Sequence, residues 1–238
     1  MTIADLAKDS LSFLILLLQE AYEDSKGNEN VRSAFIYRHA RNIADIADDM
    51  FFLYDHGRYT LSGLGLRSML ESQFCIAASL HRKDFPAEKI IAECEKWAGR
   101  LGKTVFPLGG ADITDTVSGL SELAAKLRAD FSIVSKKPWN TFEVAQAAKL
   151  EQIYNSEYAY LCNFVHSNTS AIMSQESGIG VGLAVQVAMG TVIGTAGYIA
   201  MTLQTKTPQE HVDKASKLLQ RLLEMDKAFD HLEGKRKA

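Results

Sequence analysis

The chain has 238 residues, enough for one large domain that buries about three-quarters of the surface of its unfolded chain. Apolar residues make up 47% of it and charged residues 23%, which is typical of a soluble globular protein. The formal net charge of −3 excludes the electrostatic footprint of a strong binder of nucleic acid or of anionic membranes.

The N-terminal apolar run and the cysteines both indicate a cytoplasmic protein. Residues 11–18 resemble the core of a signal peptide, but Asp5 and Asp9 precede them and no small-residue cleavage site follows. We therefore expect a core helix there. The cysteines are far apart and lack C-x-x-C spacing, so we expect buried, reduced thiols instead of a disulfide framework or a zinc site. They are Cys75, Cys94 and Cys162.

Apolar residues at helical spacing predict helices along most of the chain, and no segment alternates as a strand does. The predicted helices cover about residues 2–26, 31–55, 61–80, 86–101, 120–131, 140–168, 177–204 and 208–232. The predicted fold class is all-α: a compact bundle of seven to nine helices around a buried central helix, in one domain spanning 1–238. We expect the basic tail 234–238 to be disordered.

The uncharged stretch 177–204 is long enough to span a bilayer, and its glycines include the small-xxx-small pair Gly190 and Gly194. However, large aliphatic residues are sparse and no positive flank is evident. We expect a tightly packed core helix, with a membrane-associated helix as the alternative. The next helix opens at Thr207-Pro208, and its apolar stripe would pack within the chain or support a homodimer.

The central helix 61–80 is apolar on nearly every side, yet it contains Arg67 and Glu71 one turn apart. An isolated buried charge is costly, so we expect these two side chains to form a buried, hydrogen-bonded ion pair.

A second polar stripe lies near residue 160, where Tyr158, Cys162 and His166 follow at four-residue steps on one helix face. Arg-x-x-x-Glu on an apolar helix, followed about ninety residues later by Tyr-x-x-x-Ser-x-x-x-His, resembles a bacterial all-helical family of unknown function. Arg67, Glu71, Tyr158 and His166 match, over roughly residues 35–205. The family's serine is Cys162 here, which puts a nucleophile or ligand role at that position in doubt.

The resemblance implies a fold and the place of a site, but no activity. If the two helices pack together, Glu71 would orient His166 while Arg67 offers a fork for a phosphate or carboxylate. With the Tyr158 hydroxyl, this set suffices for acid–base cleavage of a phosphodiester. The alternative is a structural network that determines how two core helices dock.

Arg32 and His39, separated by six residues, resemble the short Arg/His motif of helical ribonucleases from bacterial toxin and phage-defence systems. In that family the pair activates and stabilises attack by a 2′-hydroxyl. Two hypotheses follow. The first is a binding or regulatory protein, part of a stress or phage-defence module. The second is a metal-independent ribonuclease or phosphodiesterase that uses His166 or His39.

No cofactor or metal is expected. The acidic cluster from Asp45 to Asp49 reads as a solvated helix face, and no dinucleotide or phosphate-loop motif has the required spacing. The remaining histidines, His81, His211 and His231 among them, read as surface residues. We expect a homo-oligomer, with a protein or an RNA as alternative partners and no membrane association.

Overall fold

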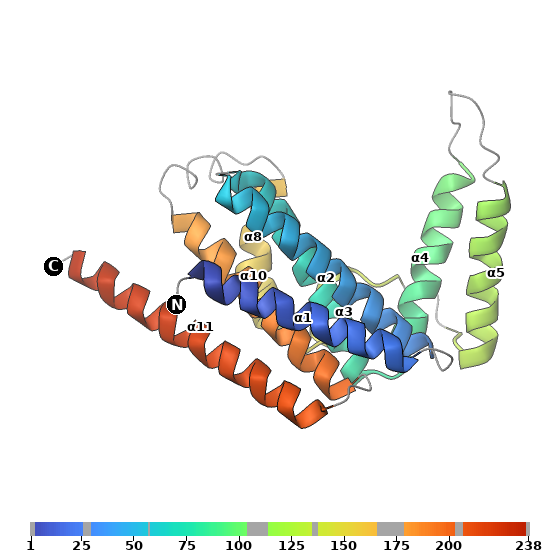
Figure 1. Ribbon diagram of the computed structural model, residues 1–238. Coiled ribbons are helices and arrows are strands. Elements are labelled where there is room, and N and C mark those ends of the chain that lie inside the picture. The colour runs from blue at the N-terminus through green and yellow to red at the C-terminus, as the bar shows by residue number, and fades with distance from the viewer. Residues whose placement is uncertain are drawn as a thin grey trace.

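The computed structural model describes residues 3–25, 30–56, 58–103, 114–134, 138–165, 179–202 and 207–236. These residues contain helices and no strand, so the predicted all-α fold is confirmed (Figure 1). The helices are α1 (Ile3–Ser25), α2 (Val31–Asp55), α3 (Tyr59–His81), α4 (Phe85–Leu101), α5 (Thr114–Phe131), α6 (Thr141–Ala147), α7 (Glu151–Ile153), the π-helix η1 (Tyr154–Tyr158), α8 (Ala159–Val165), α10 (Ile179–Thr202) and α11 (Pro208–Arg236).

Helix α3 is the centre of the bundle, as its all-round apolar sequence predicts. It packs against α2, α10, α6 and α8. From Met69 to Ser79 every residue except Glu71 is buried. The α2–α3 contact is close at Gly65, where a Cβ atom would lie 2.9 Å from Met50 Cγ. A larger residue at position 65 would therefore push the two helices apart.

Helix α10 is the core helix that the uncharged stretch predicts. It packs against α1, α2, α3 and α11, and most of its residues from Ala188 to Ala200 are buried. An uncharged sequence suits residues 188–200 because the neighbouring helices leave little of that segment exposed to water. None of the described helices combines the length and the hydropathy that crossing a bilayer requires.

The α4–α5 pair forms a hairpin at one end of the bundle, while α11 runs along the lower edge in Figure 1. The hairpin has a small core of its own, made by Ile91, Cys94, Ala124 and Leu127. An ion pair across it joins Arg128 to Glu95 at 2.7 Å. The hairpin is thus held together internally, and it rests on the bundle through α2 and α3.

Two helix predictions and one cysteine prediction differ from the structure. The predicted helix over 140–168 opens at the expected capping box, where Glu143 N donates to Asn140 Oδ1 at 2.9 Å. The helix then breaks at Lys149, because its φ of 59° lies outside the right-handed helical region. The last helix does not end near Leu232 but runs to Arg236, so it includes part of the basic tail predicted to be disordered. Cys75 and Cys94 are buried free thiols as predicted, whereas Cys162 is only half-buried.

Candidate functional site

Three of the four residues that carry the family resemblance meet in one hydrogen-bonded cluster. Arg67 Nε donates to the Tyr158 hydroxyl at 3.1 Å, and that hydroxyl donates to Glu71 Oε1 at 2.7 Å. Arg67 Nε also lies 3.3 Å from the same Glu71 oxygen. The two helices therefore pack together and bring Arg67, Glu71 and Tyr158 into contact, which is the arrangement that their suggested roles require. His166 lies outside the described residues.

The π-helix η1 positions Tyr158 at its last residue. A π turn adds one residue to a helical turn, so it rotates the following residues relative to a regular α-helix. Here it stacks the Tyr154 and Tyr158 rings with their centroids 4.9 Å apart. The centroid of the Tyr158 ring also lies 5.9 Å from that of Phe74 of α3. The aromatic contacts fix the ring, and the ring delivers its hydroxyl to the Arg67–Glu71 pair. Helical spacing alone does not predict this turn.

The expectation that the Arg67–Glu71 pair is buried is wrong. The Arg67 side chain is 26% exposed and the Glu71 side chain 42%. On the same helix Leu64 and Ser68 are exposed, so no helix in the described part of the chain covers this face of α3. Burial, followed by the hydrogen bond to Glu71, raises the pKa of Tyr158 to about 12. At neutral pH Tyr158 is thus a protonated donor to Glu71.

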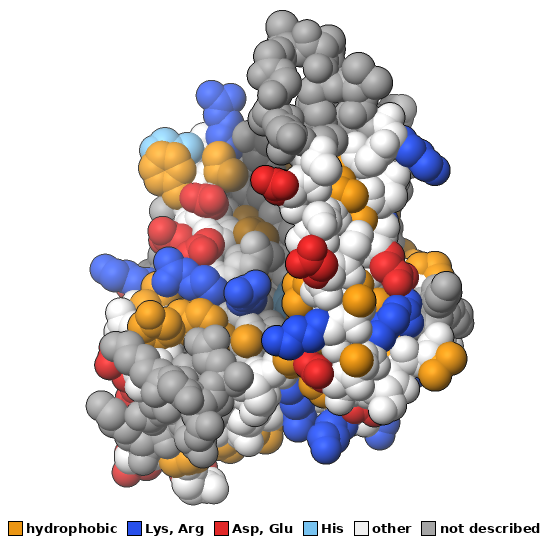
Figure 2. Space-filling view, turned by 90° about the vertical axis from the view of Figure 1, so that its right-hand side faces the viewer, with side chains coloured by type: hydrophobic (Ala, Val, Ile, Leu, Met, Phe, Trp, Pro, Cys, Tyr) orange, Lys and Arg blue, Asp and Glu red, His pale blue; other side chains and the backbone are white. Residues whose placement is uncertain are grey.

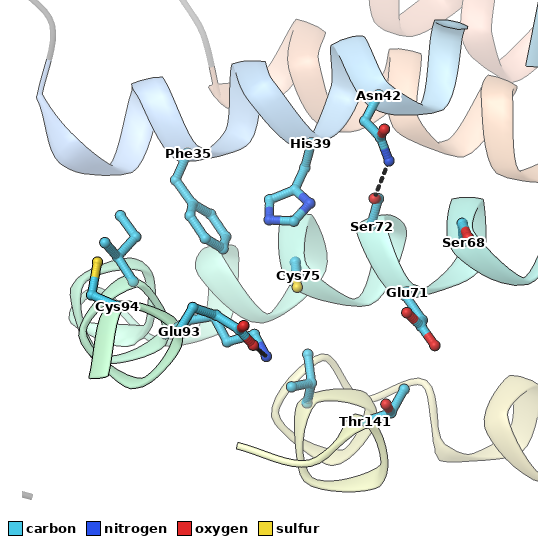
Figure 3. A pocket seen from close by; sticks show the side chains of 13 residues that line it. Phe35, His39, Asn42, Ser68, Glu71, Ser72, Cys75, Glu93, Cys94 and Thr141 are labelled. Carbon is cyan, nitrogen blue, oxygen red and sulfur yellow. Dashed lines mark hydrogen bonds and ion pairs between the residues drawn. The ribbon is translucent and has the colours of Figure 1, made fainter. Parts of the chain in front are cut away.

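A pocket of about 400 Å³ lies beside Glu71. Glu71 and Thr141 both line it, and Thr141 also hydrogen-bonds to Tyr158, so the pocket adjoins the Arg67–Tyr158–Glu71 cluster. Four helices each send a polar side chain into this space (Figure 3): His39 from α2, Glu71 from α3, Glu93 from α4 and Thr141 from α6. The other lining residues are Phe35, Asn42, Ser68, Ser72, Cys75, Lys89, Ile90, Cys94 and Val144.

His39 faces the pocket without a hydrogen bond to any described residue. Its ring packs edge-on against Phe35, with centroids 4.4 Å apart. Burial, and then the positive charge of Lys89, lower the pKa of His39 to about 4. At neutral pH the imidazole is therefore uncharged, with one donor and one acceptor nitrogen available to the pocket.

Four other polar groups of the pocket form two hydrogen-bonded pairs. Asn42 Nδ2 donates to Ser72 Oγ at 3.0 Å, and Lys89 Nζ donates to Glu93 Oε1 at 3.1 Å. Burial opposes ionisation of Glu93, but the hydrogen bond and charge of Lys89 outweigh it and hold the pKa of that carboxyl below its usual range. Burial also raises the pKa of the Cys75 thiol to about 12, so this thiol is not a nucleophile at neutral pH.

The second predicted pair, Arg32 and His39, does not form one site. Arg32 is not among the residues that line the pocket, and its Nε is buried without a hydrogen-bond partner in the described part of the chain. Phe35 lies between the two on α2 and contacts His39. His39 instead shares its pocket with Glu71, from the other predicted cluster.

Sequence analysis missed Asn42, Ser72, Lys89 and Glu93. Lys89 and Glu93 are four residues apart on one helix, a spacing that predicts their ion pair but not the cavity beside it. Among the described residues, no group of three or more acidic, histidine or cysteine side chains could hold a metal ion. Comparisons with models of protein families, with curated protein sequences and with solved structures find no match to this chain. The resemblance to the helical family stays a prediction.

Proposed function

We propose that the protein is a binding protein whose pocket between α2, α3, α4 and α6 takes a small molecule rich in hydrogen-bond donors. A volume of about 400 Å³ lies within the range of small-molecule sites. Apolar side chains cover part of the wall and polar groups converge from four helices, which is the usual composition of such a site.

The balance of free donors and acceptors supports this class of ligand. Arg67 donates to Tyr158, Asn42 donates to Ser72, and Lys89 donates to Glu93. These donors therefore already have partners within the protein. In contrast, Glu71 Oε2 and the acceptor nitrogen of His39 have no hydrogen bond from a described residue. Amine, amide or hydroxyl groups would satisfy these acceptors. A phosphate would bring more acceptors to a wall that already carries two carboxylates.

The single observation that carries the proposal is the setting of His39. A polar ring that faces a cavity without a hydrogen bond is less stable than one that is paired. A bound ligand would supply that hydrogen bond.

Blocking the pocket at its rim tests the proposal. Ser68 lines the pocket and is itself exposed, so Ser68→Phe would fill the cavity without disturbing the core. Ser216 is an exposed serine on α11, so Ser216→Phe is the matched control. We expect a library of small amines, amides and polyols, screened by NMR, to give hits whose binding Ser68→Phe abolishes and Ser216→Phe preserves. A library without hits, or hits that both variants bind equally, would contradict the proposal.

A ribonuclease or phosphodiesterase is the second candidate, and the contact between Arg67, Tyr158 and Glu71 is the observation that favours it. Two observations oppose it. With a pKa of about 4, His39 is a poor general acid at neutral pH. On the face shown in Figure 2, basic and acidic side chains lie close together, which does not favour an RNA backbone.

Total RNA from a bacterial host that produces the protein separates the two candidates. Cleaved RNA with the wild type, and intact RNA with either His39→Ala or His166→Ala, would establish a nuclease and identify its site. Intact RNA throughout is the result that the binding function predicts. A homo-oligomeric state, a protein partner and a cytoplasmic, bacterial setting in a stress or phage-defence module stay predictions.

A further inference from the structure

A second pocket, of about 340 Å³, lies where α3, η1, α10 and α11 meet. It shares no lining residue with the first pocket. Leu70 and Leu222 provide apolar wall, while the polar groups come from Gln73, Glu157, Gln186 and Thr191. We call it the Gln73 pocket.

Gln73 is the unusual residue of this pocket. Only 8% of it is exposed, and its amide makes no hydrogen bond within the described residues. The amide lines the pocket and is not among the fully buried groups that lack a partner, so water or a ligand can reach it. A molecule bound in this pocket would supply the hydrogen bond that no described residue provides.

The glycine pair of α10 makes room for this amide. A Cβ atom at Gly194 would lie 3.0 Å from Gln73 Nε2, so a side chain there would force the amide to shift. Gly190, one turn earlier, lines the pocket itself, where a Cβ would meet Leu222 only at 3.8 Å. The Gly190/Gly194 spacing thus serves the pocket as well as the approach of helices.

The free groups of the pocket define the chemistry of its ligand. The Thr191 hydroxyl already donates to Val187 O at 2.8 Å. The Gln73 amide, in contrast, offers both a donor and an acceptor to a ligand. The complement of a primary amide is another amide or a urea, which pairs through one donor and one acceptor. Glu157, the only charged side chain among the described residues that line the pocket, disfavours an anion.

We propose that the Gln73 pocket binds an uncharged molecule that carries a carboxamide-type group on an apolar body of several carbons. The carboxamide pairs with the Gln73 amide, and the apolar body packs between Leu70 and Leu222. This site is independent of the function proposed above, because no residue is shared.

Titration with hexanamide, followed by NMR, tests the proposal. We expect hexanamide to bind the wild type, and hexanoate, which has a similar shape but a negative charge, to bind at least tenfold more weakly. Gln73→Leu should weaken hexanamide at least tenfold. Gln146→Leu, which changes an exposed glutamine on α6, should leave binding unchanged. No binding of hexanamide to the wild type, or equal binding by Gln73→Leu, would overturn the proposal.

A second pair of variants keeps the test independent of Gln73 itself. Gly194→Ala displaces the amide and should weaken hexanamide severalfold. Gly197→Ala on the same helix meets Ala215 Cβ at an ordinary 3.8 Å and should not. Equal affinity of the two variants would contradict the role of Gly194. Ser68→Phe blocks only the first pocket, so hexanamide binding that survives Ser68→Phe belongs to the Gln73 pocket.

Discussion

The pocket between α2 and α4 and the seam between α1 and α11 each contain a histidine, but in opposite electrostatic settings. In the seam, His211 is 8% exposed, and its Nε2 lies 2.9 Å from Glu20 Oε2. The Phe13 ring covers it, with centroids 5.8 Å apart. In the pocket, His39 has no carboxylate partner among the described residues and lies near the positive charge of Lys89. One imidazole is therefore part of a helix–helix contact, and the other is a neutral group that a ligand can reach.

The role of each histidine depends on the residues that the neighbouring helix places against it. The sequence predicts His211 to be a surface residue, and this prediction is wrong because α1 places Glu20 and Phe13 against it. His39 was singled out for its spacing from Arg32, yet α3 and α4 give it different neighbours.

Acidification should destabilise the protein through His39. Its pKa of about 4 in the folded state is below the ordinary 6.5, so the unfolded chain binds the proton more readily. The stabilisation is present above pH 6.5 and is lost as the pH falls from there to about 4. The difference between these two pKa values corresponds to about 3 kcal/mol in the free energy of unfolding. Urea unfolding at pH 7.5, 5.5 and 4 measures it.

His39→Gln is the control for this effect, because glutamine keeps hydrogen-bonding capacity and does not titrate. Carboxylates titrate in both proteins, so the difference between them isolates His39. If wild type and His39→Gln lose the same free energy of unfolding between pH 6.5 and 4, the imidazole is not held neutral in the pocket.

His211→Ala should lower the free energy of unfolding by about 2 kcal/mol at neutral pH, because a buried hydrogen bond to Glu20 and the contact with Phe13 are lost. His81→Ala, at an exposed position in the last turn of α3, should stay within about 0.5 kcal/mol. Chemical denaturation compares them. An equally small loss in both would mean that the seam does not depend on His211.

The same contrast explains how much of the fold the sequence predicts. Helix α2 was predicted over Val31–Asp55 and has those bounds, and the Asn140 capping box opens α6 as expected. Periodicity and capping are local signals, so they locate helices well. They do not show which helix covers a given face, and the exposure of Glu71 and the burial of His211 both depend on that.

The candidate site is predictable only in part for the same reason. Arg67, Glu71 and Tyr158 carried a recognisable spacing and do meet. The pocket beside them combines His39, Ser72 and Glu93 from three helices, and no short motif joins these residues. The π turn before Tyr158 also has no periodic signal in the sequence.

Tyr158→Phe should cost about 1 kcal/mol, because it removes one hydroxyl that accepts from Arg67 and donates to Glu71. The loss is smaller than in the seam, since water can reach Glu71. Tyr154→Phe is the matched control: its ring stacks on Tyr158, and its hydroxyl makes no hydrogen bond to a described residue. Equal stability of the two variants would show that the cluster does not hold α3 against η1 and α8.

The smallest expected effect separates the Arg67–Glu71 pair from an ordinary surface pair. Arg41 and Asp45 have the same four-residue spacing on α2, at 2.9 Å, but their side chains are 59% and 58% exposed. Double-mutant cycles should give about 0.3 kcal/mol of coupling for Arg41–Asp45 and about 1 kcal/mol for Arg67–Glu71. The first coupling should vanish in high salt, and the second, sheltered by Tyr158, should persist. Equal couplings would mean that Tyr158 adds nothing to the pair, and that Arg67 and Glu71 interact as an ordinary surface pair does.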